Sequence, residues 1–220
     1  MSKIIRICDA LDQHYGRKVW ATRLPILDEL VHTVLSQNTT AKNCRQAYAT
    51  LRERFPTWED VRLARVDDIA EAIAVAGLAN QRAPRIQGIL NEIKAQQGNL
   101  DLEWLAEKPD KEALDYLLQF KGVGRKTAAC VLMFALDRPV LPVDTHVHRI
   151  AMRLGLIGEV NADKAHDLLQ EMVPPERIYS FHINTVAHGR ETCHAHRPKC
   201  EICVLREDCD YFACKSDPGR

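Results

Sequence analysis

The chain has 220 residues, of which 46% are hydrophobic, so it is long enough to bury a real core and too apolar to be a disordered tail. Thirty basic residues balance thirty acidic ones, so net charge gives no overall attraction to nucleic acid, and any DNA binding must come from local clusters. No window approaches ~18 uninterrupted apolar residues, and the first residues lack the apolar run of a signal peptide, so we expect neither a membrane span nor secretion.

Apolar residues recur at helical spacing along most of the chain, and no long alternating run predicts a strand. The first clear stripe spans residues 44–55, after a cap at Thr39 or Thr40. The sequence therefore predicts an all-α fold. Further helices are expected over residues 66–73, 86–93, 114–118, 162–172 and 178–186.

Proline and glycine mark the expected ends of two of these helices. Pro84 suits the first helical position before the 86–93 stripe, because its missing N–H costs nothing there. Gly77 is expected to end the helix before it, and Gly98 to end the stripe itself, since glycine accepts the left-handed backbone of a helix end.

Residues 117–136, LLQFKGVGRKTAACVLMFAL, contain two apolar helices joined by the short break KGVG at 121–124. Two glycines allow a tight turn and bring the backbone close to a partner. The free amides and the dipole at the start of the second helix favour an anion, and Lys121, Arg125 and Lys126 add positive charge. The break therefore predicts a phosphate contact, although a plain glycine-rich corner accounts for this motif equally well.

The segment LPVDTHVHRIAMRLG, residues 141–155, predicts a helix that begins after Pro142 with Asp144 as its N-cap. Capping alone accounts for an aspartate at this place, so the motif by itself requires no chemistry.

Four of the eight cysteines gather near the C-terminus with the spacing C-x6-C-x2-C-x5-C. Thiolates so close in sequence can surround one metal centre without a large fold behind them, and spacing alone leaves both zinc and an iron–sulfur cluster open. Cys8, Cys44 and Cys130 sit in apolar contexts typical of core packing, and Cys214 is expected to be a free thiol. The four clustered cysteines are Cys193, Cys200, Cys203 and Cys209.

Together KGVGRKTA, LPVDTHVHR and the cysteine cluster resemble the endonuclease III branch of the helix–hairpin–helix DNA glycosylases, over about residues 25–210. The resemblance implies two all-helical domains with a DNA cleft between them. One is a six-helix barrel over 28–138, and the other joins 1–27 to 139–220. The resemblance also implies that the four cysteines hold a [4Fe-4S] cluster rather than zinc.

The resemblance further implies a base-excision-repair enzyme, a DNA glycosylase that also cuts abasic sites by β-elimination. The family's catalytic lysine falls on Lys126 and its carboxylate on Asp144. The implied partner is double-stranded DNA with damaged bases, oxidised pyrimidines by default, or abasic sites. We expect a monomer in a reducing intracellular compartment, with a bacterial cytoplasm as the default.

DNA contacts follow from the same resemblance. Leu78 matches the family's wedge, which enters the base stack when a nucleotide is flipped out. Asn38 falls where the family has a gap-filling glutamine, and Ala79 and Lys121 stand where tyrosine and proline are common, so the substrate range is not predicted. The implied DNA-binding residues are Gln37, Asn38, Leu78, Lys121, Gly122, Val123, Gly124, Arg125, Thr145, His146, His196, Arg197 and Lys199.

Three alternatives stay open at this point. Monofunctional relatives that remove adenine carry a catalytic glutamate where this chain has His32, and such relatives usually lack the hairpin lysine. A non-catalytic DNA-binding protein could use the same hairpin and cluster, but it would need neither Lys126 nor Asp144. A zinc protein of similar sequence is the third alternative.

Overall fold

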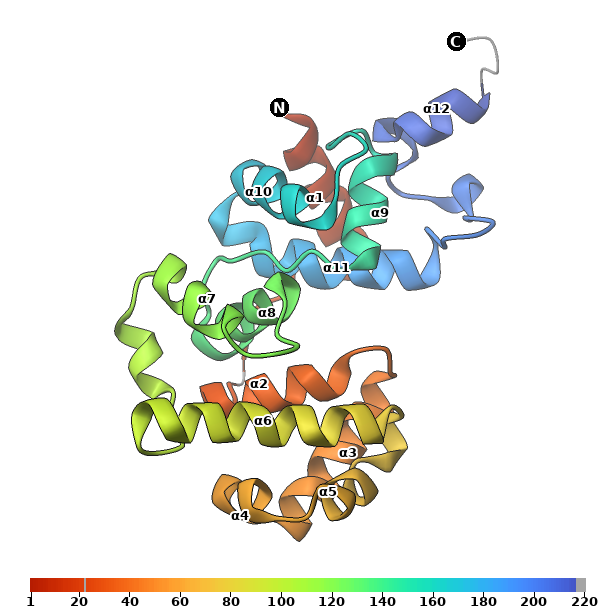
Figure 1. Cartoon of the computed structure of the whole chain (residues 1–220). Helices are drawn as coiled ribbons and strands as arrows, with labels where there is room; N and C mark the ends of the chain where they lie inside the picture. The colour runs from red at the N-terminus through yellow and green to blue at the C-terminus, as the bar shows by residue number, and fades with distance from the viewer. Residues whose placement is uncertain (22, 217–220) are drawn as a thin grey trace. The chain divides into compact units, whose positions relative to one another are not determined.

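The computed structural model describes residues 1–21 and 23–216, which hold α-helices and short 3-10 helices and no strand, so the predicted all-α class is confirmed (Figure 1). No helix in this part of the chain is both long and apolar enough to cross a membrane. The helices are α1 (Lys3–Tyr15), α2 (Ile26–Ser36), α3 (Ala41–Arg54), α4 (Trp58–Leu63), α5 (Val66–Ala72), η1 (Ala74–Ala76), α6 (Ala79–Gln97), η2 (Glu103–Glu107), α7 (Asp110–Leu118), α8 (Arg125–Leu136), α9 (Thr145–Arg153), α10 (Ala162–Met172), η3 (Pro175–Arg177), α11 (Ile178–Glu191), η4 (Cys200–Ile202), η5 (Arg206–Asp208) and α12 (Asp210–Ser216).

The chain divides into two compact units, one of Arg23–Arg138 and one that joins Met1–Thr22 to Pro139–Arg220. We call them the hairpin unit and the cysteine unit. The hairpin unit starts before the predicted boundary at residue 28, because local contacts attach its first residues to later helices. Arg23 pairs with Asp137 at 2.7 Å, and the amide of Ile26 donates to Glu103 Oε1 at 2.9 Å.

Helix α8 is the central element of the hairpin unit. It packs against α2 and α7 and is buried continuously from Thr127 to Met133. A helix that is apolar on all sides belongs in a core. The core therefore fixes the direction in which the first turn of α8 points, while Arg125 and Lys126 in that turn stay partly exposed.

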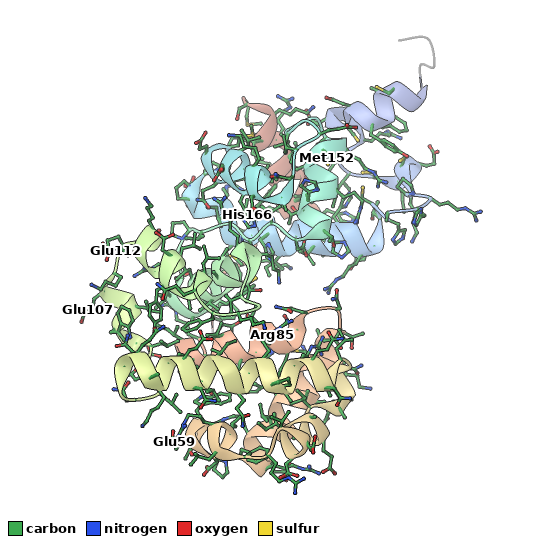
Figure 2. The ribbon with its side chains drawn as sticks, in the orientation of Figure 1. Glu59, Arg85, Glu107, Glu112, Met152 and His166 are labelled. Atoms are coloured by element: carbon green, nitrogen blue, oxygen red, sulfur yellow. The ribbon has the colours of Figure 1, made fainter. Side chains whose placement is uncertain are left out.

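Helix α6 begins at Ala79, so the prediction that Pro84 occupies the first helical position is wrong. The first turn forms earlier because the Leu78 carbonyl accepts from the amides of Gln81 and Arg82, each at 3.0 Å. Pro84 is tolerated inside the helix near its start, where few intrahelical bonds are lost. Gly98 ends α6 with φ +74°, as predicted. In Figure 2, Arg85 lies on the opposite side of α6 from Glu59 of α4.

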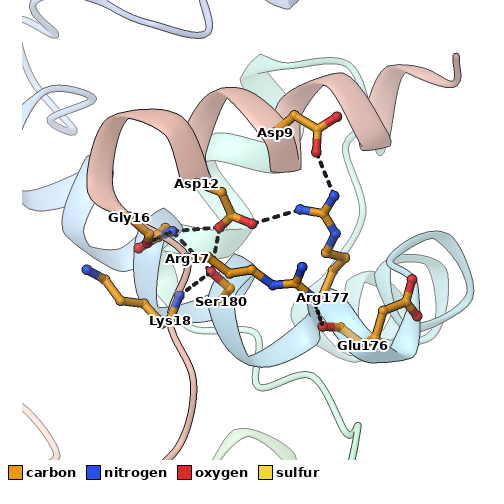
Figure 3. A network of polar contacts seen from close by, with 9 residues as sticks. Asp9, Asp12, Gly16, Arg17, Lys18, Glu176, Arg177 and Ser180 are labelled. Atoms are coloured by element: carbon orange, nitrogen blue, oxygen red, sulfur yellow. Dashed lines mark hydrogen bonds and ion pairs between the residues drawn. The ribbon is translucent and has the colours of Figure 1, made fainter.

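In the cysteine unit, α1 packs against α11 and α11 packs against α9. Charge reinforces the first contact, because Arg177 reaches Asp9 at 2.6 Å and Asp12 at 2.7 Å (Figure 3). Asp12 also accepts from Ser180 and, at 3.0 Å, from the buried amide of Asn184. The network holds the first half of α11, and α11 leads directly into the cysteine segment.

Candidate active site and cysteine centre

The KGVG break forms a tight turn between α7 and α8. Val123 is its anchor, with 5% of its surface exposed and its amide donating to the Phe120 carbonyl at 3.0 Å. Gly122 has φ +86°, a backbone conformation that suits glycine, and Gly124 is the N-cap of α8. Lys121 and both glycines are exposed, so the free amides at the start of α8 are accessible to an anion.

Lys126 lies in the first helical turn of α8, shortly after the KGVG break, and is partly exposed. Its amine makes no hydrogen bond or ion pair with any residue in 1–21 or 23–216. An amine with no carboxylate or carbonyl partner in its own protein is available to a ligand. The neighbouring Thr127 is buried and accepts from Gln37 Nε2 at 3.2 Å.

Asp144 is the N-cap of α9, as predicted from the sequence. Its Oδ1 accepts from the amide of His146 at 2.9 Å and from the amide of Val147 at 2.8 Å. The other carboxylate oxygen, Oδ2, has no hydrogen-bond partner within the described part of the chain. Capping therefore uses one oxygen and leaves the second available. Lys126 belongs to the hairpin unit and Asp144 to the cysteine unit.

His146 follows Asp144 and packs against α11, where a Cβ on Gly189 would lie 2.5 Å from its Nδ1. Its ring also contacts Arg149 Nη2 at 3.1 Å, and partial burial lowers its pKa. Thr145 beside it is exposed. Of the two residues predicted to bind DNA here, Thr145 is therefore the accessible one, and His146 is constrained by its packing.

The four clustered cysteines line one hollow of about 300 Å³, part of it open to solvent, together with Arg153, Tyr211 and Phe212. None of the four is in a disulfide. Burial, together with the charges of the three neighbouring cysteines, raises the pKa of the Cys203 thiol to about 11, so the four thiols share one space. Among the residues described, no three His, Cys, Asp or Glu side chains converge closely enough to hold a single metal ion.

Two arginines one turn apart on α9 hold the cysteine segment in place. Arg149 donates to the carbonyl of Cys193 at 2.8 Å and to that of Gly189 at 3.1 Å. Arg153 donates to Cys193 Sγ at 3.1 Å, to the His194 carbonyl at 2.7 Å and to the Ala195 carbonyl at 2.9 Å. Neither arginine is predicted from the sequence as part of the cysteine centre, although their i, i+4 spacing places them on one helical face.

A buried histidine supports the cysteine centre from the other side. His188 contacts Cys203 Sγ at 3.4 Å through Nε2 and the hydroxyl of Tyr15 at 3.1 Å through Nδ1. Burial lowers the pKa of His188 to about 4, so the ring is neutral at physiological pH. A tyrosine that donates to Nδ1 leaves the ring proton on Nε2, facing the sulfur.

The loop 194–199 is closed at its base, because the Thr192 carbonyl accepts from the amides of His194 and Lys199, both at 3.0 Å. His196, Arg197 and Lys199 are exposed on it. The closed base presents these side chains outward, as a positive patch in a chain of zero net charge.

The predicted wedge and gap-filling residues lie in two turns of the hairpin unit. Leu78 is 50% exposed and has φ +52°, and Asn38 is exposed and has φ +50°. A left-handed conformation costs about 1–3 kcal/mol for a residue other than glycine, and it is easier for asparagine than for leucine. Strain at an exposed leucine is typical of a functional turn.

Gln37, also predicted to contact DNA, has both ends of its side-chain amide hydrogen-bonded within the protein. Its Nε2 donates to Thr127, and its Oε1 accepts from Arg85 Nη1 at 3.1 Å. Arg82, one turn before Arg85, is buried and donates to the Gln37 carbonyl. The roles of Arg82 and Arg85 are not predicted from the sequence, because nothing in the helical pattern distinguishes these residues from solvated surface charges.

A solved structure of a non-covalent endonuclease III–DNA complex matches this fold with a TM-score of 0.82 and 25% identity, covering 98% of this chain and 99% of its own. The hairpin, the four-thiol hollow and this match define an endonuclease III-like helix–hairpin–helix protein. The family model described as "HhH-GPD superfamily base excision DNA repair protein" matches residues 31–175. The chain therefore belongs to the HhH-GPD superfamily.

Three relatives in sequence agree with this family. "Putative DNA glycosylase At3g47830" of Arabidopsis thaliana is 40% identical over 75% of this chain and 57% of its own length. "DNA glycosylase/AP lyase ROS1" of the same plant is 33% identical over 76% of this chain but only 14% of its own. "Endonuclease III" of Thermotoga maritima is 33% identical over 83% of this chain and 82% of its own. The chain thus spans little more than half of one plant relative and a small part of the other.

Proposed function

We propose that the chain is a bifunctional DNA glycosylase, which removes a damaged base from duplex DNA and then cuts the strand at the resulting abasic site. The observation that carries this proposal is the unpartnered amine of Lys126 in the first turn of α8, directly after the glycine turn. Relatives named as endonuclease III and as a glycosylase/AP lyase support the same assignment.

In the proposed reaction, the neutral amine of Lys126 attacks C1′ of the flipped nucleotide. The C1′–N bond to the base breaks, and the base leaves with the bonding electrons and takes up a proton. Asp144 stabilises the positive charge that develops on the sugar ring, for which its Oδ2 is available. The C1′–O4′ ring bond then breaks, O4′ takes up a proton, and the C1′=N double bond of the Schiff base forms. A C2′ proton is lost, and the C3′–O bond breaks with its electrons leaving on the phosphate oxygen, which cuts the strand.

DNA binding is proposed to rest on two local features, since net charge contributes nothing. The amides at the start of α8, with Lys121 and Arg125, would bind a backbone phosphate in the hairpin unit. The exposed His196, Arg197 and Lys199 would contact the backbone from the cysteine unit. The preferred substrate is proposed to be an oxidised pyrimidine in duplex DNA, bound by a monomer in a reducing compartment, a bacterial cytoplasm by default.

The four cysteines are proposed to hold a [4Fe-4S] cluster. Thiolates on one zinc ion lie about 2.3 Å from a single point, whereas these four thiols line the walls of a hollow, which suits a cluster with volume of its own. The cluster would act structurally, by fixing the segment that carries the loop 194–199. Arg153 and His188 would donate to its ligating sulfurs.

The test is a panel of duplexes, each with one damaged base or one abasic site, incubated with wild type, Lys126→Gln and Asp144→Asn. Borohydride reduces a Schiff base and links the protein to DNA. We expect wild type to cut the strand and to be linked to the DNA by borohydride. We expect Lys126→Gln to bind abasic DNA without cutting it and without becoming linked to it. Equal cutting by Lys126→Gln would disprove the nucleophile assignment, and base removal without trapping by wild type would indicate a monofunctional glycosylase.

A further inference from the structure

Arg82, in the first turn of α6, joins two segments of the hairpin unit that are far apart in sequence. Its side chain is 2% exposed. Nη1 donates to the carbonyls of Ala76 and Gly77, each at 2.7 Å, and Nη2 donates to the carbonyl of Gln37. All three acceptors are uncharged backbone oxygens. A guanidinium buried without a carboxylate is costly, so these bonds must serve to fix the backbone that accepts them.

Two of the three accepting carbonyls belong to the residues directly before the exposed residues in left-handed turns. Gly77 precedes Leu78, which has φ +52°, and Gln37 precedes Asn38, which has φ +50°. Asparagine tolerates this conformation because its side chain can bond to its own backbone, and leucine has no such help. The Leu78 turn therefore needs support from outside, and Arg82 supplies it while holding the Asn38 turn with its other nitrogen.

We infer that Arg82 is the positioning residue that holds Leu78 and Asn38 as one rigid two-pronged element, which enters the DNA stack where a nucleotide is flipped out, an inference that rests on the proposed function. Apolar wedges between base steps need a fixed position, because unstacking has an energetic cost that only a well-placed side chain offsets. Two prongs held by one guanidinium keep a constant separation while the duplex opens.

Arg85, one turn further along α6, extends the same support to the hairpin. Its Nη1 donates to Gln37 Oε1 at 3.1 Å. Its side chain also covers the glycine turn so closely that a Cβ on Gly122 would lie 2.3 Å from Arg85 Nε. The prongs and the phosphate-binding turn therefore share one base on α6, which sets the position of the wedge relative to the bound backbone.

The geometry calls for arginine in particular. Its planar fork directs two nitrogens toward different acceptors, whereas the lysine ammonium is a single point at the end of a flexible stem. Arg82→Lys therefore keeps the positive charge and loses the simultaneous contact with both turns. Arg62→Met is the matched control, because Arg62 lies on α4 in the same unit and its side chain bonds to Glu59 and Asn91, away from both turns.

A binding experiment tests the inference without catalysis. The duplex carries a tetrahydrofuran abasic analogue, which cannot be cut, opposite the fluorescent base 2-aminopurine, whose emission rises when it is unstacked. We expect a clear rise with wild type and with Arg62→Met, and little rise with saturating Arg82→Lys. A full rise with Arg82→Lys would overturn the inference.

Kinetics provide a second measurement. With Arg82→Lys, we expect base excision from duplex DNA to fall about a hundredfold, the cost of misplacing a reacting group by an ångström. Cutting of a preformed abasic site needs no base to be extruded, so we expect it to fall much less. Leu78→Ala combined with Arg82→Lys should lose less than the product of the two single losses, because part of the effect of Arg82 passes through Leu78. Equal losses in both reactions, or additive losses in the double variant, would contradict a role through Leu78.

Hydrogen exchange on the wild type covers the case in which Arg82→Lys does not fold. The amides of 37–38 and 76–78 should exchange together, as one cooperative element, and unrelated rates would overturn the inference. Wild type that unstacks 2-aminopurine but cuts no substrate would refute the proposed function and leave the inference intact. Wild type that binds no duplex would refute both.

Discussion

The hairpin unit and the cysteine unit each use buried or partly buried arginines to shape an irregular segment, but they differ in what else supports it. In the hairpin unit, Arg82 donates to three carbonyls in two strained turns, and Arg85 bonds to the side chain of Gln37 beside them. In the cysteine unit, Arg149 and Arg153 bond to the cysteine segment, and four thiols line the hollow proposed to hold a cluster. The first segment is thus shaped by the protein alone, and the second would be completed by the proposed cluster.

The largest effect is expected at the reacting amine. Lys126→Gln should reduce strand cutting by at least about 10⁴-fold, as loss of a nucleophile does in other enzymes, because glutamine cannot form a Schiff base. The visible absorbance of the cluster should not change, since Lys126 belongs to the other unit. Single-turnover cutting of abasic duplex checks the first expectation, and an absorbance spectrum of the same sample checks the second. A variant that lost its visible absorbance would show that Lys126 affects the cysteine unit.

The next effect is expected at the bonds between α9 and the cysteine segment. Arg153→Met removes the donor to Cys193 Sγ and to two carbonyls. Outer partners of metal ligands typically contribute 10–100-fold to retention of the metal, so the cluster should be lost to a chelator about 10–100-fold faster. Arg190→Met, at an exposed position on α11, is the control. Loss at the wild-type rate would mean that the thiols alone retain the cluster.

A smaller effect, on stability rather than on chemistry, is expected where α1 meets α11. Arg177→Met leaves Asp12 without its cation and with 13% of its side chain exposed. Its Oδ2 is then unpaired, while Oδ1 keeps the bonds from Ser180 and Asn184. An unpaired, mostly buried acceptor costs about 1–3 kcal/mol, and the free energy of unfolding measured in urea should fall by that order. Arg65→Met is the control, because Arg65 and its partner Asp67 are both highly exposed. If Arg177→Met destabilised the hairpin unit and not the cysteine unit, this account of the network would be wrong.

The smallest effect concerns pH and His146. Burial lowers its folded pKa below the ordinary value of 6.5, so folding favours the neutral ring. The stability linked to this neutral ring is present above pH 6.5 and is lost as pH falls toward the folded pKa, since the unfolded chain then binds the proton more readily. Nearby charges act on it as well, with Asp144 raising the pKa and Arg149 and Arg190 lowering it.

Thermal melts of wild type and His146→Gln between pH 7 and pH 5 check this prediction. The melting temperature of wild type should fall more steeply with acid than that of the variant. Parallel curves would assign the acid sensitivity to other groups.

The sequence predicted features that are encoded over a few neighbouring residues. Thr40 caps α3 by accepting from the Asn43 amide, Gly98 ends α6, and Asp144 caps α9, all as expected from local chemistry. The glycine turn before α8 and the gathering of four thiols were likewise visible in the spacing. These features could be read from the chain because each depends on bonds within one turn or one loop.

The sequence did not predict contacts that join distant segments. The distance from Arg82 to Gln37 is 45 positions in the chain, and that from Arg153 to Cys193 is 40. A buried arginine and a solvated one have the same letter, and only the fold distinguishes them. The predicted start of α6 was wrong for a related reason. The prediction relied on Pro84, and the bonds that the Leu78 carbonyl accepts in the preceding turn were not visible in the sequence.

The two carboxylate oxygens of Asp144 differ in their bonding. Oδ1 accepts from two amides of α9, and Oδ2 has no partner among the described residues. An asparagine would retain an oxygen for the amides and would carry no charge. One nucleotide substitution converts an aspartate codon into an asparagine codon. Architecture and reactivity at this position can therefore be inherited separately, and a perfectly folded relative could have lost its chemistry in a single mutational step.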